Sequence, residues 1–121
     1  MLPRGRLAAL ALAAVLAGCG DDGPPAQPKA DRLDVVLDDF LIKPQEVRAR
    51  PGPLAFHATN EGRLGHTLVI RRGERDVARV KTMLPGAEGE ATADLRKGKY
   101  DLVCILGNHE ELGMYGTLVV R

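Results

Sequence analysis

The stretch CILGNHEELGM, residues 104–114, carries most of what this sequence says about its fold and function. It holds one of the two cysteines of the chain, one of its three histidines and one of its three methionines. Four residues separate Cys104 from His109, and four more separate His109 from Met114. Two His and one Cys with a weak axial Met form the donor set of blue-copper electron-transfer sites. The stretch therefore indicates copper, because zinc more often takes Asp, Glu or water in place of the methionine.

The spacing also lets one loop bring three donors together. Cys104 is expected at the end of a strand, and a glycine in each connection lets the chain fold back, first to His109 and then to Met114 on the axial side. One flexible loop would not hold its geometry through a redox change, so a fourth ligand has to come from elsewhere. His66, which opens a strand directly after the turn NEGRLG, is the expected partner.

From Arg32 onward, short runs of β-branched and aliphatic residues alternate with Gly, Pro and Asn, which is typical of an all-β domain. No stretch has a persuasive helical period. Seven or eight strands at this spacing predict a β-sandwich with Greek-key connections, with a barrel as the alternative. We expect the strands at residues 33–37, 46–50, 54–59, 67–72, 77–82, 90–94, 99–105 and 116–120.

Alternation within these strands predicts which side chains point inward. Cys104 shares a face with Leu102, and His66 shares a face with Leu68. If the leucines mark the interior, Cys104 and His66 both point into the core. His57 lies inside a strand, away from any turn, and we expect it to be structural.

Two segments, TNEGRLGHTLVI (59–70) and LPGAEGEATADLRKGKYDLVCILGNHEELGMYGTLVV (84–120), resemble the cupredoxins, the small blue copper proteins that include plastocyanin, azurin and rusticyanin. The resemblance covers about residues 33–121 and is weak before Leu54. It implies a Greek-key β-sandwich that binds one type 1 copper ion and carries single electrons.

The resemblance also implies a role for each donor. His66 matches the upstream histidine ligand, Cys104 the thiolate, His109 the second histidine and Met114 the axial ligand. The Cys-x4-His-x4-Met spacing is closest to the rusticyanin-like branch. The loop has a single cysteine, whereas the related binuclear copper domain of cytochrome oxidase needs two, so we expect a mononuclear site.

Thr67 and Asn60 are expected in the surroundings of the ligands. Thr67 stands where plastocyanin-like and azurin-like members often have Asn, and we expect its hydroxyl to donate a hydrogen bond toward the Cys104 sulfur. Other readings stay open: Cys104 as a small buried hydrophobe or as the nucleophile of a Cys–His enzyme site, and Met114 as a core residue. We identify neither an oxyanion donor pair nor an acid that would orient the histidine, so we expect no enzyme.

Residues 1–31 do not resemble part of a folded domain. Two arginines precede the apolar run LAALALAAVLAG (7–18), which fits the apolar region of a signal peptide and is too short to span a bilayer. The run ends in LAGC, which resembles the lipobox of bacterial lipoproteins, with Cys19 as the acylated residue; the alternative is an ordinary secretory signal. We therefore expect a signal peptide at 1–18, a lipidated Cys19 with a flexible tether at 19–31, and a copper-binding domain at 32–121.

Charge and composition restrict the partners. Loss of Arg4 and Arg6 with the signal peptide leaves 15 of 17 basic side chains against 16 acidic ones, a net charge of about −1. With no basic block and only four aromatic residues, the chain has no obvious surface for nucleic acid. We expect a monomer, held at the cell envelope by its lipid and facing the periplasm or the outside, that meets redox proteins transiently.

The docking surface is expected around His109, the ligand nearest to solvent. Leu64 and Leu112 would give an apolar patch there, and Glu110 and Glu111 an acidic rim. The rival function is copper storage or delivery with the same donors. That function would favour an open entry rich in Met or His, and the chain has only three of each.

Overall fold

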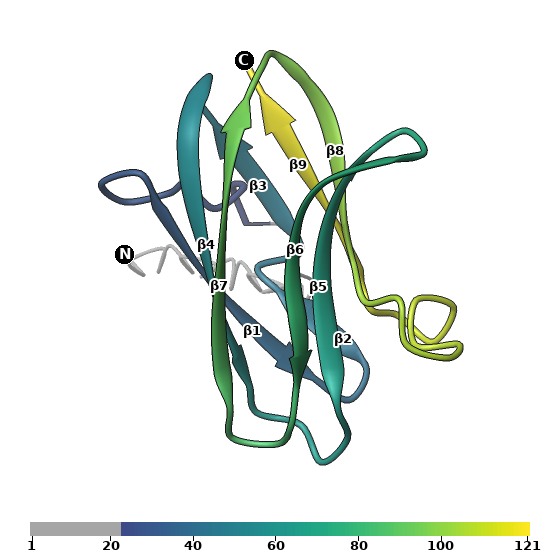
Figure 1. Ribbon diagram of the computed structural model, residues 1–121. Coiled ribbons are helices and arrows are strands. Elements are labelled where there is room, and N and C mark those ends of the chain that lie inside the picture. Colours follow the sequence, from purple (N-terminus) through teal and green to yellow (C-terminus); the bar gives the residue numbers. More distant parts are fainter. Residues whose placement is uncertain (1–22) are drawn as a thin grey trace, which may run out of the picture.

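The computed structural model describes residues 23–121, so the expected signal peptide and the lipidation site Cys19 lie outside the described residues. Two β-sheets pack face to face, and the described residues contain no helix (Figure 1). It follows that no helix in this part of the chain could cross a membrane. The strands are β1 (Arg32–Asp38), β2 (Leu41–Lys43), β3 (Glu46–Ala49), β4 (Gly52–Asn60), β5 (His66–Arg72), β6 (Arg75–Met83), β7 (Glu88–Leu95), β8 (Gly98–Val103) and β9 (Tyr115–Val120).

The sheets have the strand orders β2-β1-β4-β7 and β3-β9-β8-β5-β6. Only β1–β2, β5–β6 and β8–β9 are sequence neighbours that pair within one sheet, so the other connections cross between the sheets. Two pairs are parallel, β1 with β4 and β3 with β9. The predicted Greek-key β-sandwich is thus confirmed, and the alternative of a closed barrel is wrong.

The core lies between the sheets and follows the predicted alternation. In β1, Leu33, Val35 and Leu37 are buried, while Arg32 and Asp34 are exposed. A strand alternates in this way because successive side chains point to opposite faces. The core is aliphatic, with Phe56 as its largest fully buried side chain.

The structure differs from the sequence prediction in its shortest elements. All eight expected strands are present, but β2 makes a ninth, because three residues are too few to show an alternating pattern. β8 ends at Val103, so Cys104 follows the strand and does not belong to it. In the expected tether, Ala26 donates its N–H to the Glu46 carbonyl at 3.0 Å and accepts the Arg48 N–H at 2.9 Å, so this part lies along β3.

The topology places several strand ends at one end of the sandwich. β1 runs parallel to β4 with Leu37 beside Asn60, so the ends of both strands lie together. The turn after Asn60 leads directly to His66 at the start of β5. The long connection from β8 to β9, residues 104–114, projects beside these strand ends (Figure 1).

We expect burial between the sheets to decide the stability of the domain, and two leucines provide a matched test. Leu118 is fully buried on β9, whereas Leu84 is 70% exposed. Leu118→Ala should lower the free energy of unfolding by roughly 2–5 kcal/mol, because it removes buried methyl groups and leaves a cavity. Leu84→Ala should change it by about 0.5 kcal/mol or less. Urea denaturation measures both, and equal losses would contradict this location of the core.

Candidate metal centre

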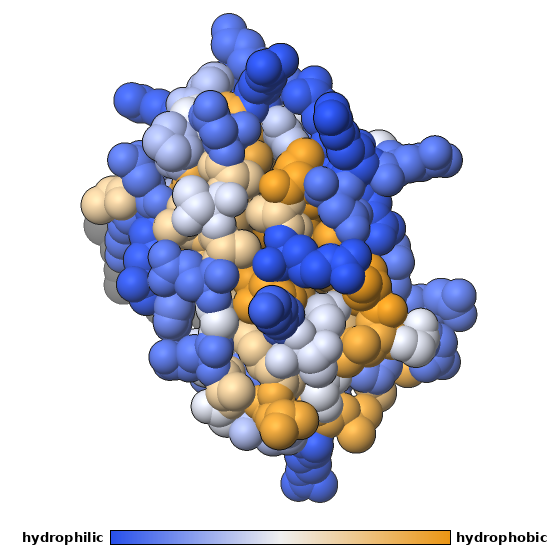
Figure 2. Space-filling model, in the orientation of Figure 1, coloured by the Kyte–Doolittle hydropathy of each residue, from blue (hydrophilic) through white to orange (hydrophobic). Residues whose placement is uncertain are grey.

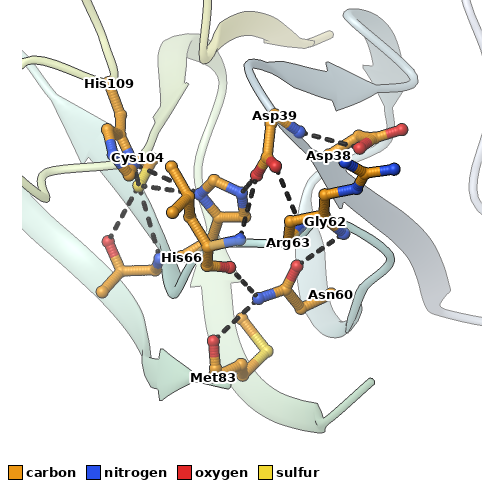
Figure 3. A network of polar contacts seen from close by, with 11 residues as sticks. Asp38, Asp39, Asn60, Gly62, Arg63, His66, Met83, Cys104 and His109 are labelled. Carbon is orange, nitrogen blue, oxygen red and sulfur yellow. Dashed lines mark hydrogen bonds and ion pairs between the residues drawn. The ribbon is translucent and has the colours of Figure 1, made fainter. Parts of the chain in front are cut away.

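Three of the candidate ligands meet at one point. The His66 Nδ1 atom lies 3.2 Å from the His109 Nδ1 atom. The Cys104 Sγ atom lies 3.7 Å from His109 Nδ1 and 4.0 Å from His66 Nδ1. All three donor atoms fall within 4.8 Å of one another, and His66 and Cys104 are fully buried. Figure 3 shows the three side chains pointing toward the same space.

The loop that carries Cys104, His109 and Met114 is closed by main-chain hydrogen bonds. The Cys104 N–H donates to the Met114 carbonyl at 3.1 Å, and the Met114 N–H donates to the His109 carbonyl at 3.0 Å. Gly113 has a φ of 128°, and a Cβ atom there would lie 2.8 Å from the Phe40 carbonyl oxygen, so glycine is required. Met114, the last residue of this loop, is fully buried.

Thr67 directs two donors at the Cys104 sulfur. Its N–H lies 3.4 Å from Sγ and its hydroxyl 3.7 Å, and the hydroxyl also accepts the Ile105 N–H at 3.1 Å. The hydroxyl contact is the one the sequence suggests, whereas the N–H contact follows from the backbone of β5. Donors on a sulfur ligand fix its position and tune the metal that it binds.

An acid that the sequence analysis did not identify contacts His66 from the other side. The Asp39 Oδ1 atom lies 2.6 Å from His66 Nε2. Hydrogen bonds from the N–H of Arg63, then from His66 and from the Leu64 N–H, keep the pKa of the Asp39 carboxyl below its ordinary value, although partial burial acts to raise it. Asp39 is therefore ionised at neutral pH.

One signal in the sequence could have found Asp39. It continues the inward-facing positions Leu33, Val35 and Leu37 by one step beyond β1. An acid at that position of the alternation calls for a buried partner. The acid contacts His66 and not His109, the histidine of the Cys–His enzyme alternative, and the two partners are 27 residues apart in the sequence.

Two further residues surround the cluster. Asn60, expected near the ligands, is fully buried and bonds to the loop that precedes His66 rather than to a donor atom. Phe40, also missed, places its ring 4.9 Å from the His109 ring and 6.4 Å from the His66 ring, centre to centre, with the ring planes steeply inclined.

Exposure separates His109 from the other candidate ligands. His66, Cys104 and Met114 are fully buried, whereas His109 is partly exposed. Leu64 is 45% and Leu112 50% exposed. Glu110 and Glu111 are exposed as well, and His57 lies elsewhere, with Asp34 and Glu88 on the outer side of the four-stranded sheet.

The donor set fits a soft or borderline metal ion. Two imidazole nitrogens and one sulfur converge, and His66 turns Nδ1 toward the other two donors while its Nε2 faces Asp39. The buried Cys104 has little access to a substrate, which argues against a nucleophilic role.

Comparisons with known proteins identify the fold. No family model matches the chain, and no curated protein matches it. Among solved structures, reduced auracyanin from the photosynthetic bacterium Roseiflexus castenholzii is similar, with a TM-score of 0.70 and 16% identity over 76% of this chain and 98% of auracyanin. The azurin Az-iso2 from the obligate methylotroph Methylomonas sp. strain J has a TM-score of 0.68 and 13% identity over 77% of this chain and 99% of that azurin. Both neighbours are cupredoxins, and the chain therefore has the cupredoxin fold.

Proposed function

We propose that the protein binds one type 1 copper ion through His66, Cys104, His109 and Met114 and acts as a one-electron carrier. The observation that carries this proposal is the convergence of two imidazole nitrogens and one sulfur within 4.8 Å, beside a closed loop that ends in a buried methionine. Copper bound there would supply one-electron chemistry between Cu(II) and Cu(I). In this role the protein is not an enzyme by itself.

The chain's own part is to hold the donors in one geometry. Thr67 fixes the Cys104 sulfur, Asp39 fixes the His66 ring, and main-chain hydrogen bonds fix the loop of His109. Because these supports come from the strands and the loop, little has to move when the charge at the centre changes. A fixed, largely buried centre suits an electron carrier.

His109 is the proposed point of electron entry and exit, since its ring is the ligand edge closest to solvent. Leu64 and Leu112 supply apolar surface, and Glu110 and Glu111 supply negative charge. Figure 2 shows apolar residues along the lower edge, where Figure 1 has the β4–β5 and β6–β7 connections, and at the lower right, toward the β8–β9 connection. A small apolar patch with an acidic rim suits a redox protein that binds weakly and carries positive charge.

Two parts of the proposal concern the setting of the protein. We propose that Cys19 carries a lipid that holds a monomeric domain at the cell envelope, on the strength of the lipobox-like LAGC and the basic and apolar segment before it. Copper storage or delivery would use the same donors. The burial of His66, Cys104 and Met114 favours electron transfer over ready metal exchange.

Cys104→Ser should abolish the intense visible absorption band of the copper-loaded protein. The band of a type 1 site is a sulfur-to-copper charge transfer, and Cys104 is the free cysteine of the described residues. Visible absorption after copper loading measures the effect, with circular dichroism to show that the variant folds. A folded variant that keeps its blue colour would refute the assignment.

Met114→Gln should keep copper bound but lower the reduction potential, because an amide oxygen is a harder axial donor and favours Cu(II). Met83→Leu is the control, since Met83 is buried in the core without a place in the donor set. Voltammetry compares the two variants. Equal potentials in both would mean that Met114 is a packing residue.

Leu112→Lys should slow electron exchange with a redox partner severalfold while the copper spectrum stays unchanged, because it places a charge in the apolar patch. Thr92→Lys adds the same charge on the exposed face of β7 and should have little effect. Stopped-flow kinetics measures the exchange. Equal rates in both variants would move the docking site away from the His109 side.

A further inference from the structure

We propose that Asp39 is the positioning residue of the metal centre: it holds His66 in the form that carries its proton on Nε2, and its charge biases the centre toward the more highly charged state of the metal. The second half of this inference rests on the proposed copper function. The first half concerns the protein without metal and stands independently.

The contact itself dictates the state of His66. Both oxygens of the Asp39 carboxylate already accept main-chain N–H groups, Oδ2 from Arg63 and Oδ1 from Leu64, so Oδ1 faces His66 as an acceptor and the 2.6 Å contact places a proton on Nε2. In the neutral imidazole Nδ1 then has the free lone pair, and it is this atom that faces His109 Nδ1 at 3.2 Å and Cys104 Sγ at 4.0 Å. Because the His66 side chain is fully buried, water does not compete for either nitrogen. Asp39 thus prepares Nδ1 as a metal donor before any metal arrives.

The Asp39 carboxylate is itself held in place by the turn between β4 and β5. The Arg63 N–H donates to Oδ2 at 2.8 Å, and the Leu64 N–H donates to Oδ1 at 3.3 Å. Asn60 holds that turn in place (Figure 3). Its Oδ1 accepts the Gly62 N–H at 2.8 Å, and its Nδ2 donates to the Leu64 and Met83 carbonyls, each at 2.8 Å.

Gly62 gives an independent indication that the chain is built around this pair. A Cβ atom at residue 62 would overlap the Asp39 carboxylate and lie 2.8 Å from His66 Nε2. The backbone of Gly62 is not in the left-handed region, so the requirement for glycine is one of space and not of conformation. Because Gly62 has no side chain, the turn packs closely over the hydrogen bond between Asp39 and His66 and shields it from water.

The two histidines are therefore held in different ways. The ring contacts of His109 within the described residues are with His66, Cys104 and Phe40, and none of them is an acid. A carboxylate on a histidine ligand fixes the ring and raises the basicity of the donor nitrogen. The negative charge of Asp39 also favours Cu(II) over Cu(I), so it should lower the reduction potential below the value that a neutral acceptor would give.

The test combines a variant of nearly the same shape with a charge control. Asp39→Asn removes the charge, and Glu61→Gln removes a charge from an exposed side chain in the same turn. In the metal-free wild-type protein, nitrogen NMR of the imidazoles should show His66 protonated at Nε2 and not at Nδ1. Asp39→Asn should weaken or abolish this preference, and Glu61→Gln should leave it intact.

With metal, Asp39→Asn should lose about 10- to 100-fold in Cu(II) affinity. Its reduction potential should rise, and a tenfold larger loss for Cu(II) than for Cu(I) corresponds to about 59 mV. Glu61→Gln should show neither effect, and the visible band should remain in both variants. Competition with a chelator and voltammetry provide the two measurements.

The outcomes separate the two proposals. A wild-type His66 protonated at Nδ1 would overturn the inference even if Asp39→Asn failed to fold. A blue, copper-loaded Asp39→Asn protein with unchanged affinity and potential would also overturn it and leave the proposed function standing. Protonation at Nε2 that is lost in Asp39→Asn, in a protein without a blue copper form, would support the positioning role and refute the copper function.

Discussion

The hydrogen bond from the Cys104 N–H to the Met114 carbonyl is the constraint on which the centre depends. It continues the β8–β9 ladder one step beyond the pair of Val103 and Tyr115, so the nine residues between Cys104 and Met114 begin and end at a fixed place. The other main-chain hydrogen bonds of this segment lie within the loop and do not fix it to the sheet. With the hydrogen bond between Cys104 and Met114, the thiol, the imidazole and the thioether are tied to two strands of a packed sheet.

The surroundings of the centre combine opposite electrostatic effects. Thr67 places an N–H and a hydroxyl against the Cys104 sulfur, which draws electron density away from that ligand. Asp39 places a negative charge against His66, which adds electron density to that imidazole ring. If copper binds here as proposed, its reduction potential would depend on two opposed contacts and could be adjusted by changing either one, without altering the ligands themselves.

The candidate ligands differ in how firmly they are held and in how far they are exposed to solvent. Cys104 and His66 are buried and held by contacts with Thr67 and Asp39, whereas His109 is partly exposed and contacts the ring of Phe40. The site is therefore held firmly at Cys104 and His66 and is accessible to solvent at the His109 ring. The exposed Leu64 and Leu112 belong to the proposed docking surface around that ring.

The sequence by itself determined the parts of this protein that depend on short spacing. Alternation with a period of two located eight strands and predicted that Cys104 and His66 face inward, because side-chain direction in a strand is a local property. The spacing of Cys104, His109 and Met114 is likewise a local property of the sequence, and it indicated the candidate ligand loop. The sequence did not predict β2, because a strand of three residues is too short to show an alternating pattern.

Only the tertiary structure decided what surrounds the ligands. Asp39 meets His66 because β1 and β4 pair in parallel, which brings the end of β1 beside the turn that leads into β5. Asn60 acts on the centre through that turn, and Ala26 joins β3 although its composition suggests a free tether. These contacts join residues far apart in the chain, and their register follows from strand order and sheet packing, which no local pattern encodes.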